Sequence, residues 1–282
     1  MSHAQELPTP QPVTQGRRIK AVFFDFMGTC LDWHSGVANA LPAAIAEATR
    51  SRLALDWREE FFKELHARSQ QGLPPEDIDI THRKTLLRIL GWDVYKEERR
   101  HFVGLDNDGG STDVVGVVGV VAPDGGGTAA IERAVRSWHN MAPWSDVRPA
   151  LTALKGKLGL ELFVLANGTT RLQLDLVRSS GLEGIFSLLF SSELLGVYKP
   201  APEAYKKALG LVKVRPHEAV MVAAHAYDLR AAKALGMNTM YVYRWTDDRS
   251  EDMDVVRREN DVFLGESENG MEGLYSAIEA LN

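Results

Sequence analysis

Several side chains that could do chemistry stand directly after short apolar runs of this 282-residue chain. Asp25 ends the first run, in FFDFMGTCLD, and Asn167 ends the second, in VLANGTT. A carboxylate can act as a nucleophile or accept a proton, and an amide can hold an anion or orient a neighbouring group. Each residue alone is weak evidence, because an Asp after a strand commonly caps the next helix.

Two later segments add a cation, a second acid and a histidine. Lys199 follows the third apolar run, in SSELLGVYKP. The fourth run leads into VAAHAYDLRAA, which contains His225, Tyr227 and Asp228. In an open parallel sheet, ligands bind at the carboxyl ends of the strands. An acid, an amide, a cation and another acid in this order therefore predict one site, with the cation favouring an ionised carboxylate.

The apolar runs alternate with helical patterns. The runs are Ile19–Phe24, Leu160–Ala166, Ile185–Phe190, Ala219–Ala223 and Thr239–Tyr243. The helical patterns between the later runs are Arg171–Ser180, Pro202–Leu209 and Asp228–Leu235, with Gly181, Gly210 and Gly236 at expected helix ends. Such alternation indicates parallel strands joined by right-handed crossovers. The sequence predicts an α/β fold with a doubly wound, Rossmann-like parallel sheet.

Between Gly36 and Pro143 this alternation stops. The segment predicts helices only, over Val37–Arg50, Asp56–Gln71, Ile80–Leu90 and Thr128–His139. In the second of them, apolar residues recur every fourth position and form one stripe. A mostly helical block inserted after the first strand is expected to form a cap domain over the active edge of the sheet.

The domain boundaries follow from these patterns. We assign residues 19–35 and 144–282 to the core domain and residues 36–143 to the helical cap domain. Within the cap, the Gly/Val-rich insert 105–127 is expected to be a surface loop. Residues 1–18 hold three prolines and no apolar core of signal-peptide length, so they are interpreted as a disordered leader.

Composition narrows the class of function. The formal net charge is −6 and there is no basic block, which argues against a nucleic-acid partner and fits a small-molecule enzyme. No window is apolar enough to span a bilayer, so no membrane partner is expected. The single cysteine, Cys30, cannot form an intrachain disulfide, which favours a reducing compartment and a cytoplasmic location. A homodimer is one possible oligomeric state, which the sequence alone does not decide.

Taken in order, the motifs resemble the haloacid dehalogenase superfamily. The order is DxxGT, a strand ending in NG, then YKP, then a strand with a late Asp, and it extends from Ile19 to about Tyr243. The greatest similarity is to the 2-haloacid dehalogenase group. FDFMGTCLDW is similar to that group's nucleophile loop, YKPAPEAY to its lysine motif, and the Trp57-Arg58 pair to its cap arginine.

Two departures from the phosphatases of the superfamily bear on the chemistry. The phosphatases place a second Asp two residues after the nucleophile, where this chain has Met27. Their Gly-Asp pair, which supplies a magnesium ligand, is matched here by Ala223-Ala224. Magnesium requires carboxylates and near-octahedral oxygen ligands. Because a halide leaves without a proton, these losses disfavour a phosphatase and suit a metal-independent dehalogenase with no cofactor.

The resemblance implies a mechanism with Asp25, Lys199 and Asp228 as catalytic residues. Asp25 would attack the halogen-bearing carbon of a small organic acid and form an ester, which water then cleaves. Lys199 would hold Asp25 ionised, and Asp228 would orient Lys199 or help to activate water.

The remaining site residues are expected to bind the substrate. Backbone N–H groups of the loop from Phe26 through Met27 to Gly28, together with Thr29, would stabilise charge on the ester oxygen. Arg58 would meet the leaving halide from the cap, and Asn167 would hold the halide or the substrate carboxylate. His225 and Tyr227 replace the family's Asn and Trp, and Ala166 replaces its hydroxyl residue, so the substrate pocket differs from that of a standard dehalogenase.

Two other hypotheses stay open. The same nucleophile could act on an epoxide, a strained ester or a biosynthetic intermediate, which Ala166 and the long cap insert favour. A non-catalytic binding protein on this fold is disfavoured, because an acid, a cation and a second acid have no structural need to occur together. We expect packing or hinge roles for His82, Arg83 and His139, and we expect Trp138 and Trp144 to pack the cap onto the core.

Overall fold

The computed structural model describes residues 19–74, 76–102, 126–265 and 270–282. The expected leader and nearly all of the expected glycine- and valine-rich insert lie outside these ranges. Within the described residues, no helix is long and apolar enough to cross a membrane.

A parallel sheet forms the centre of the core domain. Its six strands lie in the order β5 (Leu188–Ser191), β4 (Glu161–Ala166), β1 (Ala21–Phe24), β6 (Ala219–Ala223), β7 (Asn238–Val242) and β8 (Val262–Leu264). Every neighbouring pair is parallel. The predicted fold class is confirmed, and the second and fourth expected strands, β4 and β6, flank β1. Strand β8 was not expected from the sequence.

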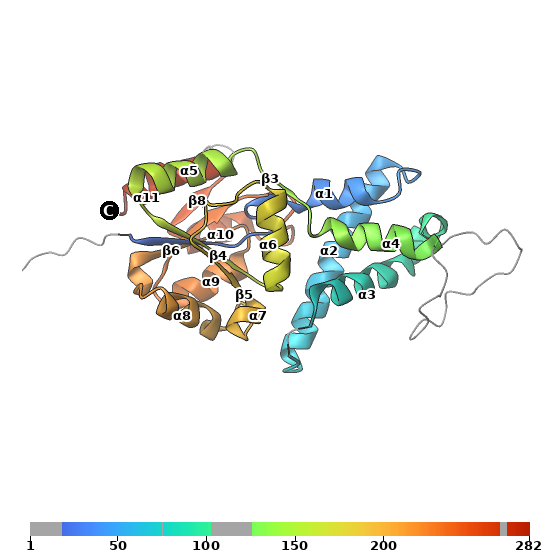
Figure 1. Ribbon diagram of the computed structural model, residues 1–282, viewed down its shortest axis with the longest axis horizontal. Coiled ribbons are helices and arrows are strands. Elements are labelled where there is room, and N and C mark those ends of the chain that lie inside the picture. The colour runs from blue at the N-terminus through green and yellow to red at the C-terminus, as the bar shows by residue number, and fades with distance from the viewer. Residues whose placement is uncertain (1–18, 75, 103–125, 266–269) are drawn as a thin grey trace, which may run out of the picture.

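Helices cover both faces of the sheet (Figure 1). One face carries α5 (Val147–Leu158), α6 (Thr170–Ser179) and α11 (Leu274–Glu279), and the other carries α8 (Pro202–Leu211), α9 (Ala226–Ala234) and α10 (Met253–Glu259). Strand β1 is buried on both sides: Val22 and Phe24 face one layer, and Ala21 and Phe23 face the other. Shorter elements join the layers: α7 (Ser192–Leu195) and the 3-10 turns η3 (Pro216–Glu218) and η5 (Gly270–Gly273).

The inserted segment forms a separate helical lobe at one end of the sheet (Figure 1). It contains α1 (Trp33–Ala40), α2 (Glu47–Gln70), α3 (Ile78–Leu90), α4 (Gly126–Ser137) and the 3-10 turns η1 (Asp93–Tyr95) and η2 (Glu98–His101). Strand β2 (Leu31–Asp32) pairs antiparallel with β3 (Ala142–Pro143), so the chain enters and leaves the lobe through one two-stranded stem.

The boundary predicted between the first two cap helices is wrong. Helices over Val37–Arg50 and Asp56–Gln71 were expected, but α1 ends at Ala40 and α2 runs unbroken from Glu47 to Gln70. The break falls at Pro42, which has no N–H to donate and pushes Leu41 into extended backbone at ψ 154°. Similarly, Gly210 lies inside α8 rather than after it.

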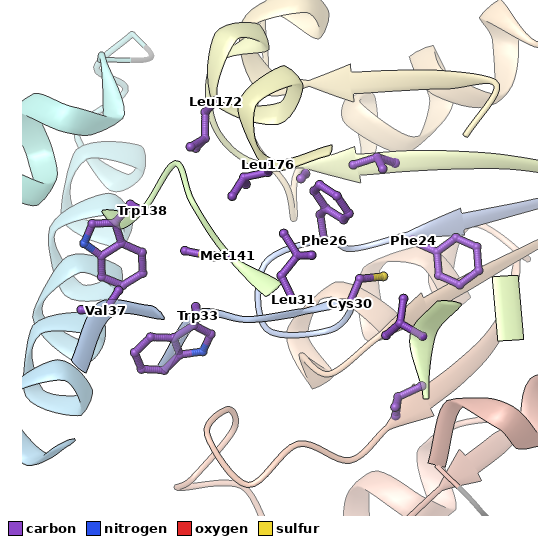
Figure 2. Close-up of a cluster of buried hydrophobic side chains, with 14 of the residues drawn as sticks. Phe24, Phe26, Cys30, Leu31, Trp33, Val37, Trp138, Met141, Leu172 and Leu176 are labelled. Carbon is purple, nitrogen blue, oxygen red and sulfur yellow. The ribbon is translucent and has the colours of Figure 1, made fainter. Parts of the chain in front are cut away.

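A continuous hydrophobic cluster joins the sheet to the helical lobe. Figure 2 shows it extending from Phe24 through Phe26 and Leu31 to Trp33 and Trp138. The Trp138 ring stacks on Trp33 with 5.7 Å between ring centroids. Trp138 therefore packs at the start of the lobe, against the residue that directly follows the stem strand β2.

Three other residues with expected packing roles also lie at or near this junction, whereas Arg83 pairs with Glu132 inside the lobe. His82 is fully buried and stacks on Trp138 at 4.3 Å, and burial holds the pKa of His82 well below its ordinary value. Trp144 donates from Nε1 to the carbonyl oxygen of Gly28 at 2.9 Å. His139 lies between Asp79 of the lobe and Asp175 of the core, at 2.9 and 3.0 Å.

Replacing Trp138 by Ala should cost about 3–5 kcal/mol of unfolding free energy, because it leaves a cavity in the middle of the stacked rings. Urea unfolding monitored by circular dichroism measures this loss. Val94→Ala, at a residue 47% exposed in the same lobe, is the matched control and should change stability little. An equal loss for the two variants would contradict this view of the junction.

Candidate active site

The candidate site lies where the winding of the sheet reverses. The chain moves outward from β1 through β4 to β5, then returns to β6 on the other side of β1. Ligands bind at the carboxyl ends of the strands at such a switch point. Asp25 follows β1 and donates its backbone N–H to Val222 at 3.0 Å, and His225 follows β6. The topology therefore brings these two residues together.

Lys199 joins the two catalytic carboxylates that the sequence predicted. Its Nζ lies 2.8 Å from Oδ1 of Asp25 and also donates to Oδ2 of Asp228. The hydroxyl of Tyr205 donates to the other oxygen of Asp228. The Lys199 side chain is 1% exposed, so solvent screens these interactions little. An acid, a cation and a second acid thus form one buried chain of contacts.

The second oxygen of Asp25 has two further partners. Thr29 donates from Oγ1 to Oδ2 at 2.7 Å, and Nδ1 of His225 lies 3.0 Å from the same oxygen. The backbone N–H of Ala224 donates to Oγ1 of Thr29 at 2.8 Å. Because that contact occupies a lone pair of the Thr29 hydroxyl, its hydrogen is left to point at Asp25.

Asp247 is a site residue that the sequence reasoning missed. Its Oδ1 lies 3.1 Å from Nε2 of His225, and its Oδ2 accepts from Trp33 at 3.1 Å and from Thr246 at 2.7 Å. The carboxylate also approaches Gly28, whose backbone has φ +92° and where a Cβ would lie 2.8 Å from it. Glycine at position 28 therefore leaves room for Asp247.

A signal for Asp247 was present in the sequence. The residue lies in RWTDDRS, just beyond the fifth apolar run, and strand ends were the criterion that found the other residues. Tyr205 was missed for another reason. It is the last residue of YKPAPEAY, where only the lysine received a role.

Electrostatics keep Asp25 ionised. Burial opposes the carboxylate, but the charges of Lys199 and His225 outweigh it and hold the pKa of Asp25 well below its ordinary value. Burial likewise opposes the ammonium of Lys199, yet Asp228 and Asp25 raise its pKa above the ordinary value. The lysine therefore stays charged beside an ionised Asp25.

His225 is held as an imidazolium. Burial disfavours the charged ring, but Asp25 and Asp247 overcome this effect and raise the pKa of His225 from 6.5 to about 10. Two carboxylates, one at each ring nitrogen, require a donor at both, and only the protonated ring supplies two.

Arg58 reaches the nucleophile loop from the helical lobe. Its Nη1 lies 3.0 Å from the sulfur of Met27, and its guanidinium carbon lies 4.5 Å from the centre of the Phe62 ring. The residue is buried, and in the described part of the chain it has no carboxylate ion-pair partner. Burial lowers its pKa, but an arginine still keeps its charge. A buried cation without an acid partner favours binding of an anion.

A cavity of about 860 Å³ opens beside these groups, between α2 and the strand ends. Arg58, Lys199, His225 and Tyr227 line it, and Asp25 lies directly behind Lys199 and His225 with 6% of its surface exposed. Burial raises the pKa of Tyr227, so its hydroxyl stays protonated.

Two groups that were predicted to bind substrate already form hydrogen bonds to other groups of the protein. The amide of Asn167 lines the cavity, but it donates to the carbonyl oxygen of Lys199 at 3.0 Å and accepts from the N–H of Lys199 at 2.8 Å. The backbone N–H of Gly28 donates to the carbonyl oxygen of Leu31 at 3.1 Å. This N–H is therefore not available to stabilise charge on the ester oxygen, as the sequence had suggested for the loop. The Phe26 side chain is buried against Phe186 instead of facing the cavity.

The carboxylates of this site do not suit magnesium. The ammonium of Lys199 lies between Asp25 and Asp228 and would repel a divalent cation there. Met27 presents a sulfur where a third carboxylate would be needed, and magnesium strongly prefers oxygen. No group of metal-binding side chains was found in the described residues.

Comparisons with known proteins show which family this chain is similar to. The family model for haloacid dehalogenase-like hydrolases matches residues 19–236. An (S)-2-haloacid dehalogenase 4A from Burkholderia cepacia is 27% identical over 226 residues, which are 80% of this chain and 84% of that protein. A haloacetate dehalogenase H-2 from Moraxella sp. (strain B) is 32% identical over 113 residues, 40% of this chain and 50% of that protein. The chain thus matches only about half the length of the Moraxella protein.

One solved structure is similar over nearly the whole chain. The crystal structure of an L-2-haloacid dehalogenase matches with a TM-score of 0.70 and 27% identity, covering 93% of this chain and 99% of that one. The similarity includes both the sheet and the helical lobe.

The ring of His225 should remain protonated well above neutral pH. We expect its nitrogen resonances to titrate near pH 10. The contribution of the charged ring to the free energy of unfolding should be complete below pH 6.5 and lost as pH rises through about 10. Nitrogen-15 NMR of the imidazole measures this directly. Asp247→Asn should lower the pKa, because one of the two flanking charges is gone. A ring that titrates near 6.5 in the unaltered protein would contradict the assignment.

Proposed function

Because the chain belongs to the haloacid dehalogenase-like hydrolases, we propose that it is a 2-haloacid dehalogenase in which Asp25 displaces the halide. The substrate would be a small organic acid with a halogen on the carbon next to the carboxylate. Asp25 attacks that carbon, the carbon–halogen bond breaks, and an ester of Asp25 forms. Water then attacks the carboxyl carbon of Asp25 and releases a 2-hydroxy acid.

The observation that carries this proposal is the contact of Asp25 with Lys199, together with a buried Arg58 that lines the adjoining cavity and has no carboxylate in ion-pair contact among the described residues. Attack at carbon requires an ionised carboxylate, and Lys199 provides the charge that keeps it so. A halide that leaves as an anion is stabilised by a nearby cation, and Arg58 lines the cavity with no carboxylate in ion-pair contact in the part of the chain that the structure describes. Attack by Asp25 and departure of the halide are therefore each assisted by a different cation, Lys199 and Arg58, that is already in place.

Asp228 supports the lysine in this scheme. Its carboxylate accepts from Lys199 and from Tyr205, which fixes the ammonium toward Asp25. Burial raises the pKa of Asp228, and the charge of Lys199 offsets this effect only in part. Asp228 is fully buried, so it acts through Lys199 and not by direct contact with substrate.

The cap domain would close the site. We propose residues 36–143 as the cap and residues 19–35 and 144–282 as the core, with Arg58 as the cap's contribution to the reaction. Tyr227 and His225 form part of the cavity wall and would contact the organic acid. Asn167 would act mainly by holding the backbone of Lys199, because its amide is occupied there.

Asp25→Asn should reduce chloride release from 2-chloropropionate by at least about 10³-fold, because the amide is a poor nucleophile. Chloride release is measured alongside panels of phosphate esters and epoxides, so that the alternative electrophiles are tested too. Asp254→Asn, at an exposed site in α10, is the matched control and should retain full activity. Turnover of phosphate esters or epoxides in place of haloacids would refute the dehalogenase proposal.

Chloride release should persist in excess EDTA. The physical reason is that Lys199, and not a metal ion, neutralises charge between Asp25 and Asp228. Initial rates with EDTA, and after readdition of magnesium, test this expectation. Loss of activity that magnesium restores would show that the site uses a metal after all.

A further inference from the structure

The two oxygens of Asp25 have unequal surroundings. Oδ1 is contacted by Lys199, whereas Oδ2 faces both Thr29 and His225. Each donor occupies a lone pair, so the oxygen with fewer donors is the better nucleophile. Oδ1 therefore forms the bond to substrate in the proposed reaction. Oδ2 becomes the carbonyl oxygen of the ester and keeps its two donors.

We propose that the imidazolium of His225 is an oxyanion donor for hydrolysis of the Asp25 ester, with Asp247 as its positioning residue. This inference rests on the proposed function. Water adds to the carboxyl carbon, and the electron pair of the carbonyl bond moves onto Oδ2. The Nδ1–H of His225 and the hydroxyl of Thr29 point at that oxygen where the charge develops.

The step balances without another reactant. When the carbonyl bond re-forms, the bond between the carboxyl carbon and Oδ1 breaks, and the hydroxy acid leaves with Oδ1. One proton of the attacking water goes to the product hydroxyl, and the other is released to solvent. Asp25 is again a carboxylate, and His225 has kept its proton throughout.

The surroundings of His225 favour a charged donor over a proton acceptor. The ring is 4% exposed, and Asp247 still faces Nε2 after Asp25 has become a neutral ester. In the proposed step the ring keeps its proton through its contact with Asp247, so His225 acts as a donor and not as a general base. The titratable groups around the ring are those of Asp25, Tyr227, Asp247 and Asp248.

Asp247 is the residue that holds the imidazolium of His225 in place. Three donors converge on its carboxylate, from His225, Trp33 and Thr246, and burial there would otherwise favour the protonated acid. Against that burial, His225 first, then the charge of Arg58 and the hydroxyl of Thr246, hold the pKa of Asp247 below its ordinary value. The carboxylate thus stays charged and keeps the imidazolium oriented toward Oδ2.

The test separates the two chemical steps with His225→Gln. Loss of this donor should leave formation of the ester largely intact, because Lys199 still contacts Asp25 and holds its carboxylate ionised. Hydrolysis should slow by about 100-fold. With 2-chloropropionate, rapid quench should then give a burst of one chloride per site, and intact-mass spectrometry should show the propionate adduct on Asp25. His217→Gln, at the far end of β6, is the control and should show no adduct.

A second variant, Asp247→Asn, keeps the test decisive even if His225→Gln does not fold. In Asp247→Asn, the rate of ester hydrolysis should fall with rising pH at a lower pH than in the unaltered protein, because the imidazolium loses its proton more easily. Hydrolysis that rises with pH through the same range would make His225 a base and overturn the inference. Equal slowing of both steps in His225→Gln would also overturn it. No chloride release by the unaltered protein would instead refute the proposed function itself.

Discussion

The ammonium of Lys199, buried between Asp25 and Asp228, is the interaction on which the site depends. Two carboxylates at this depth would repel each other, and burial would drive at least one to bind a proton. A single cation in contact with both removes that conflict and holds Asp25 ionised. The same cation would repel a divalent metal ion from the space between the two carboxylates.

The rest of the site extends this pairing of charges. His225 lies between Asp25 and Asp247, and Arg58 lines the same cavity with no carboxylate in ion-pair contact within the described ranges. Low solvent exposure makes each pairing strong and makes an unpaired charge costly. Binding of an anion would therefore stabilise Arg58, which has no acid in ion-pair contact in the described part of the chain. A displaced halide supplies one during the proposed reaction.

The sequence predicted the parts of this arrangement that follow from strand ends and missed those that depend on packing. Asp25, Lys199 and Asp228 were found because parallel strands bring their carboxyl ends to one edge. Asp247 lies in a loop whose path past Gly28 depends on the tertiary fold. Pro42 was a local signal for the end of α1 and was overlooked, whereas the engagement of Asn167 by the backbone of Lys199 could not be read from spacing.

The most direct test of the central claim is a single turnover of 2-chloropropionate in water enriched in oxygen-18, with enzyme in excess. If Asp25 is the nucleophile, the hydroxy acid carries an oxygen that came from Asp25 and contains no label. The heavy oxygen should then appear in a peptide containing Asp25 by mass spectrometry. Label found in the product, with none in that peptide, would mean that water attacks the substrate directly and that Asp25 forms no ester.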